Sequence, residues 1–139
     1  MADIRVETGV VFFNINDKVT IAFNPTDAEL VEKIFDVFNS MDERQERYQE
    51  LVQKTENKKK IFDIARRESN EMRKVIDSIF GRPICKPLFG KMNVLALADG
   101  LPVWANLMLA IFDQIDTTFA REQKATNARI KKYTERWKK

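Results

Sequence analysis

The chain has 139 residues, of which 44% are hydrophobic and 32% charged, with a formal net charge of +3. It contains no histidine, one cysteine and four glycines. The composition is typical of a single globular domain. The missing histidines exclude imidazole bases and imidazole metal ligands, and one cysteine cannot form a thiolate zinc site or an internal disulfide. We therefore expect no catalytic, cofactor or metal site, and a protein that acts by binding.

Hydropathy and cysteine content indicate where the protein acts. The longest apolar stretch, Val103–Phe112, is interrupted by Asn106 and is too short to cross a membrane. The first residues lack the basic and apolar pattern of a secretory leader, and one unpaired cysteine fits a reducing compartment. We expect a protein of the bacterial host cytoplasm with no membrane contact.

Positive charge is concentrated at the C-terminus. Residues 121–139 contain eight Lys or Arg against two Glu, so the remaining 120 residues are net acidic. We expect a globular domain over residues 1–120 and a basic helical extension over residues 121–139. The extension also supports an alternative interpretation, nucleic-acid binding, with these contact residues: Arg129, Lys131, Lys132, Arg136, Lys138 and Lys139.

Residues 4–24 are predicted to form a β-hairpin. Apolar residues alternate with polar ones on both sides of Asn16-Asp17-Lys18, a sequence suited to a tight turn. A three-residue loop puts six apolar side chains on one face, in the pairs Ile15–Val19, Phe13–Ile21 and Val11–Phe23. Ile4 and Val6 are expected to extend the sheet beyond Gly9.

A capping box predicts the start of a helix over about residues 26–56. Thr26 would accept from the amide three residues on, while Glu29 reaches back. The first half of this helix has an apolar face, whereas its second half is charged, with Glu43/Arg47 and Glu50/Lys54 spaced for salt bridges.

The helical pattern resumes over about residues 59–80 and ends at Gly81. The polar residues 55–60 permit a bend without forcing one, so residues 26–80 could be one helix or two, and we favour two. Pro83 and Pro87 argue against a helix between Gly81 and Gly90.

A short helix over about residues 93–99 and a final helix over residues 102–120 complete the prediction. The short helix would stop at Asp99-Gly100, and Pro102 suits the first turn of the last helix. The fold class is α+β and mainly α-helical, with an N-terminal β-hairpin followed by about four helices. The predicted core includes Phe35, Phe38, Trp104, Met108, Ile111 and Phe112.

Few side chains qualify as reactive groups. Cys85 has no neighbouring base to activate it, so we interpret it as a half-buried loop residue. Asp113 and Asp116 lie off the apolar stripe of the last helix, which indicates a solvated face. Asp99 and Asp113 do not have the spacing of a metal site.

Two groups of apolar residues exceed what one small core can cover. A surplus apolar helix face predicts a client interface or self-association, and we expect a homo-oligomer. The candidate interface residues are Tyr48, Leu51, Val52, Ile130, Tyr133 and Trp137.

The order of these features resembles a known family. A hairpin leads into the capped segment Asn24–Glu29, followed by a charged helical middle, the pair Ile79-Phe80-Gly81 and Leu88-Phe89-Gly90, and an apolar helix with a charged tail. This layout, over about residues 10–120, resembles the tail assembly chaperones of long-tailed phages and prophages of Gram-positive bacteria. The chain departs from that pattern where Pro83, Cys85 and Pro87 replace a more flexible linker.

The resemblance implies a non-enzymatic protein that binds the tape-measure protein and helps to recruit tail-tube subunits. Apolar helix faces would shield the long client until the tube forms around it. Two alternatives remain open: a small nucleic-acid-binding or regulatory protein, and a structural phage assembly subunit. Charge-driven nucleic-acid binding should weaken steeply with salt, whereas apolar client capture should not.

Overall fold

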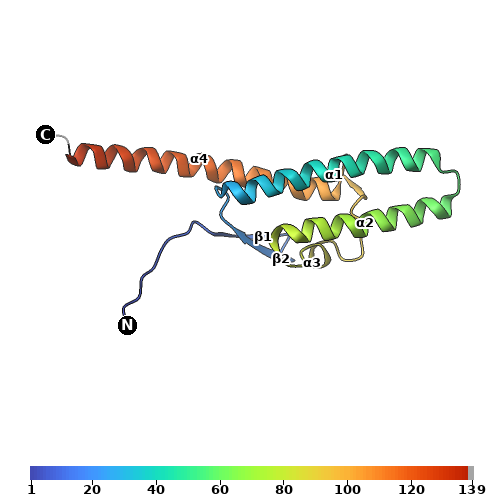
Figure 1. Cartoon of the computed structure of the whole chain (residues 1–139), viewed down its shortest axis with the longest axis horizontal. Helices are drawn as coiled ribbons and strands as arrows, with labels where there is room; N and C mark the ends of the chain where they lie inside the picture. The colour runs from blue at the N-terminus through green and yellow to red at the C-terminus, as the bar shows by residue number, and fades with distance from the viewer. Residues whose placement is uncertain (138–139) are drawn as a thin grey trace.

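Three long helices and an N-terminal β-hairpin make up the fold (Figure 1). The computed structural model describes the backbone of residues 1–137 and the side chains of residues 1–124. Helices α1 (Ala28–Lys54) and α2 (Lys58–Phe80) form an antiparallel pair. Helix α4 (Val103–Trp137) runs back along the first part of α1 and continues past it. The mainly helical α+β class is thus confirmed.

The hairpin has the predicted register. Strands β1 (Val11–Ile15) and β2 (Val19–Phe23) pair with Ile15 opposite Val19 and Phe13 opposite Ile21. Asn16 and Asp17 both have positive φ angles, 55° and 57°, which these residue types tolerate better than most. Val19, Ile21 and Phe23 of β2 are buried, and the Phe23 ring packs between those of Phe13 and of Phe80 on α2, with centroids 5.0 and 5.7 Å away.

The expected extension of this sheet through Ile4 and Val6 is wrong. Residues 1–10 belong to no strand and lead away from the body of the molecule (Figure 1). The reason lies at Gly9, which turns the chain with a φ of 71°, and at Asn24, whose Nδ2 donates to the Thr8 carbonyl over 2.8 Å.

The predicted capping box at Thr26 is also wrong, because the next residue caps α1. The Asp27 carboxylate accepts from the Glu29 amide, while the Thr26 amide and hydroxyl donate to Asn24 Oδ1. The preference for two helices is confirmed. The chain leaves α1 at Thr55, and the Asn57 side chain accepts from the Lys59 amide to cap α2.

The segment between Gly81 and Gly90 contains a short helix that the prolines were expected to exclude. Helix α3 (Cys85–Phe89) has Pro87 in its first turn, where a missing N–H leaves no hydrogen bond unmade. The Asp77 carboxylate accepts from the amides of Ile84 and Cys85, at 2.9 and 3.0 Å. An acceptor on α2 thus satisfies the free amides at the start of α3.

The helix expected at residues 93–99 does not form. Strands β3 (Leu97–Ala98) and β4 (Leu101–Pro102) pair there as a second hairpin, and α4 starts directly after Pro102. Asp99 and Gly100 have φ angles of 59° and 82°. Positive φ at both central residues is the geometry of the two-residue turn that Asp-Gly favours, so this dipeptide marks a hairpin and not the end of a helix.

One contiguous core joins the hairpin, α1, α2, α3 and α4. Of the predicted core residues, Trp104, Met108 and Ile111 are buried, and Phe38 and Phe112 are partly buried. Phe35 contradicts its prediction, because 52% of its surface is exposed. It lies at the edge of the α1–α4 contact, where its ring contacts that of Phe112.

Polar contacts connect the helices around this core. The Trp104 indole N–H donates to Gln45 Oε1 on α1 at 3.0 Å, and Arg44 forms a 2.9 Å salt bridge with Glu68 on α2. Neither predicted pair within α1, Glu43/Arg47 or Glu50/Lys54, forms a salt bridge among the side chains that the structure describes. The charged half of α1 is therefore joined to α2 instead.

Candidate functional site

An apolar groove lies between the first half of α1 and the middle of α4. It encloses about 320 Å³. Its lining residues are Val31, Phe35, Phe112, Ile115, Asp116, Phe119, Ala120 and Gln123. Phe35 is 52% exposed and Phe119 53% exposed, so two large aromatic side chains border the groove without being covered.

The helical repeat explains how α4 builds one wall of this groove. Phe112 and Phe119 are seven residues apart, close to two full turns, so they lie on one face of α4. The opposite wall comes from α1, where the Phe35 ring lies 4.7 Å from that of Phe112. Phe38 packs edge-on against Phe112, with ring centroids 5.6 Å apart. The Phe112 ring is therefore held in place by packing against Phe35 and Phe38 before anything binds.

The groove has a negative edge. Asp116 is the one charged side chain among its lining residues, and Asp113 lies exposed one turn earlier on α4. Both aspartates lie on a solvated helix surface, as predicted. An apolar floor with a carboxylate at its rim suits a segment that combines apolar and basic side chains.

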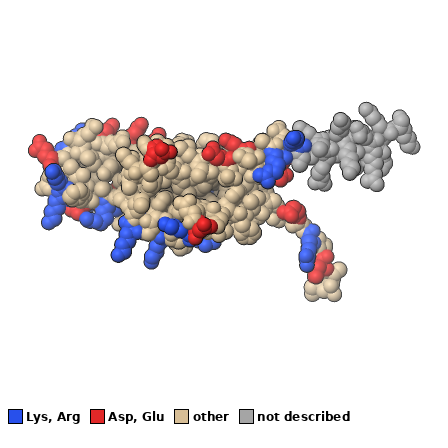
Figure 2. Space-filling model, turned by 180° about the vertical axis from the view of Figure 1, so that it is seen from behind, with Lys and Arg blue, Asp and Glu red and all other residues tan. Residues whose placement is uncertain are grey.

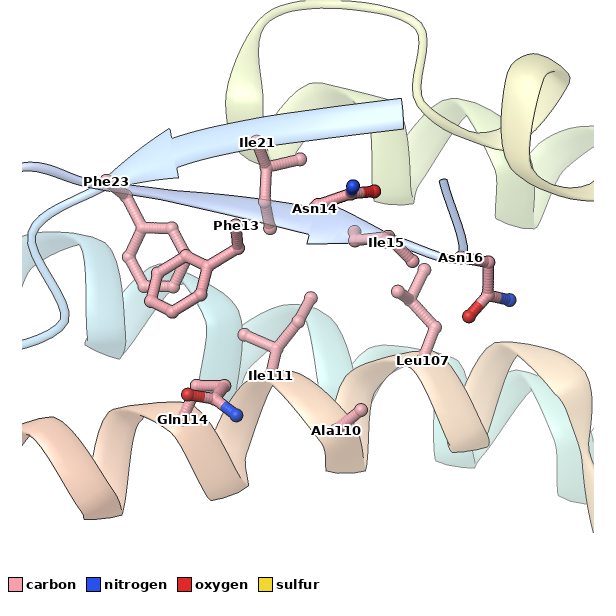
Figure 3. A pocket seen from close by; sticks show the side chains of 10 residues that line it. All are labelled: Phe13, Asn14, Ile15, Asn16, Ile21, Phe23, Leu107, Ala110, Ile111 and Gln114. Atoms are coloured by element: carbon pink, nitrogen blue, oxygen red, sulfur yellow. The ribbon is translucent and has the colours of Figure 1, made fainter. Parts of the chain in front are cut away.

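A second apolar pocket, of about 270 Å³, lies between the hairpin and the other side of α4 (Figure 3). Phe13 and Ile15 point from β1 toward Leu107 and Ile111 on α4. No residue lines both this pocket and the α1–α4 groove. Helix α4 thus carries two separate apolar depressions.

Cys85 is fully buried in α3, more deeply than the half-buried position expected for it. Burial raises the pKa of this thiol from an ordinary value of 9.0 to about 12, and the negative charge of Asp77 adds to the increase. At neutral pH the thiol is protonated and shielded, which makes it unsuitable as a nucleophile. Among the residues with described side chains, no three Cys, Asp or Glu are grouped as metal ligands.

The predicted interface residues are not brought together. Leu51 is 48% exposed near the end of α1, and Tyr48 and Val52 beside it are partly buried. The turn from α1 to α2 and the C-terminal turns of α4 lie at opposite ends of the molecule (Figure 1). The side chains of Ile130, Tyr133 and Trp137 lie outside the described residues.

The candidate nucleic-acid contacts also lie outside the described side chains: Arg129, Lys131, Lys132, Arg136, Lys138 and Lys139. Within the described part, Figure 2 shows most Lys and Arg along the lower edge and at the left end of the molecule, whereas Asp and Glu dominate its upper edge. Arg66, Arg73 and Lys91 do line one shallow pocket. Two of these three cations are already engaged, because Arg73 donates to the Gly90 and Met92 carbonyls and Arg66 pairs with Asp63.

The sequence pattern did not identify the groove, because its phenylalanines fit the apolar stripes of two core helices. The width of those stripes is the sequence feature that could have indicated the groove, because a wide stripe contains residues that cannot all face the core. Phe35 lies next to Ile34, so both cannot point to the centre of the core from one helix. One of these two residues must therefore lie at the edge of the core.

Comparison with known proteins places the chain in one family. A model for a family of unknown function, DUF6673, matches residues 17–139, so the chain belongs to this family. No curated protein and no solved structure matches it. Across the described residues, no helix has the combination of length and apolar character needed to span a bilayer.

Proposed function

We propose that this member of the DUF6673 family is a non-enzymatic assembly chaperone of phage tails. In this proposal it holds an amphipathic helix of the tape-measure protein in the α1–α4 groove until tail-tube subunits take over the client. The observation that supports it is the pair of half-exposed phenylalanines, Phe35 and Phe119, on either side of one apolar groove. The resemblance of the chain to tail assembly chaperones supplies the identity of the client.

The dimensions of the groove favour a protein segment over a small molecule. Its volume of about 320 Å³ is at the lower limit of small-molecule pockets, which enclose about 300–1,000 Å³. An amphipathic helix needs only a shallow groove that accepts a few side chains from adjacent turns. Exposed aromatic residues on a rigid floor are also the residue type that dominates binding energy in protein interfaces.

The aspartates on α4 would make the groove prefer a client helix that carries basic residues. Asp116 lines the groove and Asp113 lies close to it, so basic residues flanking the apolar face of the client helix would be favoured. Because these carboxylates are exposed, they would mainly affect orientation and association rate. Most of the affinity would come from apolar contact.

Co-expression with the tape-measure protein encoded in the same genome tests the proposal. The wild-type chain should keep this client soluble and co-purify with it. Phe35→Glu and Phe119→Glu each place a charge in the groove and should abolish co-purification. Phe62→Glu is the matched control, because Phe62 is 64% exposed on α2, does not line the groove, and should tolerate the change.

The same assay separates the alternatives. Apolar capture should survive moderate salt, whereas binding through the basic C-terminal residues would weaken steeply as counterions compete. Equal co-purification of all three variants would refute the groove as the binding site. Recovery of the protein in finished phage particles would favour a structural subunit over a chaperone.

A further inference from the structure

The N-terminal residues form an extended segment with the pattern of a strand but with no sheet to join. Ile4 and Val6 alternate with charged residues, which is a period-two pattern. Their side chains are 90% and 75% exposed. The segment leads away from the hairpin and crosses no other element (Figure 1).

Contacts at the base of the segment direct it away from its own sheet. Asn24, which follows β2, donates from Nδ2 to the Thr8 carbonyl, and the Gly9 amide donates to the Glu7 carboxylate. A Cβ atom on Gly9 would lie 2.7 Å from Asn24 Nδ2, so only glycine fits this close approach. Contacts of specific residues thus set the direction in which the segment leaves the hairpin.

The same chain offers a surface for a strand of this kind. β1 pairs with β2 on one side only, so alternate N–H and C=O groups along its other edge can pair with an added strand. The pocket of Figure 3 lies beneath this edge. Residues 13–16, from β1 and the turn, contribute four lining residues, whereas β2 contributes only Ile21 and Phe23. The pocket therefore lies under the face of the hairpin and extends to β1, the strand with the free edge.

We propose that residues 3–8 of one copy add as a strand to the free edge of β1 in a second copy. Ile4 and Val6 then fill the pocket between β1 and α4 of that copy, against Phe13, Leu107 and Ile111. The exchange is reciprocal and forms a two-fold symmetric dimer. Because it uses none of the groove residues, this inference is independent of the proposed function.

The area of this exchange is sufficient for a stable dimer. The six residues 3–8 weigh about 0.7 kDa and expose roughly 1,000 Å² when extended. If each segment buries about half of that surface, and covers a similar area of its partner, the two exchanges bury about 2,000 Å² in total, at the upper end of the roughly 1,200–2,000 Å² of a standard interface.

The mass of the full chain in solution tests the proposal. The wild type should be a dimer by light scattering. The double variant Ile4→Asp/Val6→Asp should weaken dimerisation at least tenfold, because each aliphatic side chain buried is worth about a factor of ten in affinity. The matched control, Asp3→Ser/Arg5→Ser, changes alternate charged residues of the same segment and should remain a dimer. Both should keep the helical content of the wild type.

A cross-link distinguishes exchange between copies from folding back within one chain. In a Cys85→Ala background, chains with Val6→Cys are mixed with chains that carry Ala110→Cys in the pocket. Oxidation should give a disulfide-linked pair that contains one of each. A monomeric wild type, an unchanged mass for the aspartate double variant, or the absence of the mixed disulfide would each overturn the proposal.

Discussion

Cys85 shows how the environment of one residue determines its chemistry. Its thiol has a pKa near 12 because it is buried and lies beside the Asp77 carboxylate. At a given pH below 9, the thiolate fraction is then about a thousandfold lower than that of an ordinary cysteine. The thiol should consequently react with Ellman's reagent about a thousandfold more slowly in the folded protein than in guanidinium chloride. Equal rates in the two states would contradict the buried position.

The same pKa shift predicts how stability depends on pH. Because folding raises the pKa, the unfolded chain loses the proton first as the pH rises. The contribution of the thiol to stability is complete below pH 9 and is lost progressively toward pH 12. The stability advantage of the wild type over Cys85→Ala should therefore shrink as the pH rises from 8 to 11, as measured by urea unfolding.

The helix cap of α1 and the exposure of Phe35 could not be predicted from the sequence alone. Thr26 and Asp27 are both good capping residues, and the choice between them depends on Asn24, which engages the Thr26 hydroxyl and leaves the cap to Asp27. Phe35 fits a core stripe by spacing, yet it lies at an edge because of where α4 packs. Both outcomes depend on neighbours that a local pattern does not contain.

Among the elements, the register of the hairpin was predicted correctly, whereas its extension through Ile4 and Val6 and the short helix α3 were not. The register of β1 and β2 follows from alternation and loop length, which are local properties. Helix α3 depends on an acceptor seven residues upstream, because Asp77 on α2 satisfies its first amides. Short elements of this kind are stabilised by tertiary contacts and leave little local signal.

The role of Asp77 in α3 can be tested by substitution. Asp77→Ala removes an acceptor of two partly buried amides and should lower the free energy of unfolding by roughly 2–3 kcal/mol. Asp77→Asn keeps an oxygen in place and should cost less. Asp63→Ala is the control on the same helix, since its exposed salt bridge to Arg66 should contribute under about 1 kcal/mol. Urea unfolding curves measure all three, and similar losses for Asp77→Ala and Asp63→Ala would contradict this role.

At the scale of the whole molecule, the arrangement of the helices determines how far apart the two groups of candidate interface residues lie. The candidate interface residues fall in two groups, Tyr48–Val52 and the C-terminal extension, and α1 ends at one end of the molecule and α4 at the other. The distance between segments depends on the direction in which α4 packs, which no helical periodicity encodes. The fold instead has two apolar depressions on different sides of α4, one beside α1 and one beneath the hairpin.

The contiguous core predicts that the molecule unfolds as one unit. Trp104 contacts α1 through Phe38 and Gln45, whereas Cys85 reports on the packing of α3 against α2. In a Trp137→Phe background, the urea midpoint from Trp104 fluorescence should therefore equal the midpoint for exposure of the Cys85 thiol. Met72→Ala, which leaves a cavity at a fully buried position on α2, should shift both midpoints by the same amount, equivalent to about 2–5 kcal/mol. In a molecule with one shared core, Trp104 and Cys85 must become exposed in the same transition. Different midpoints would therefore mean that the α1–α4 contact and the α2–α3 contact belong to parts that fold separately.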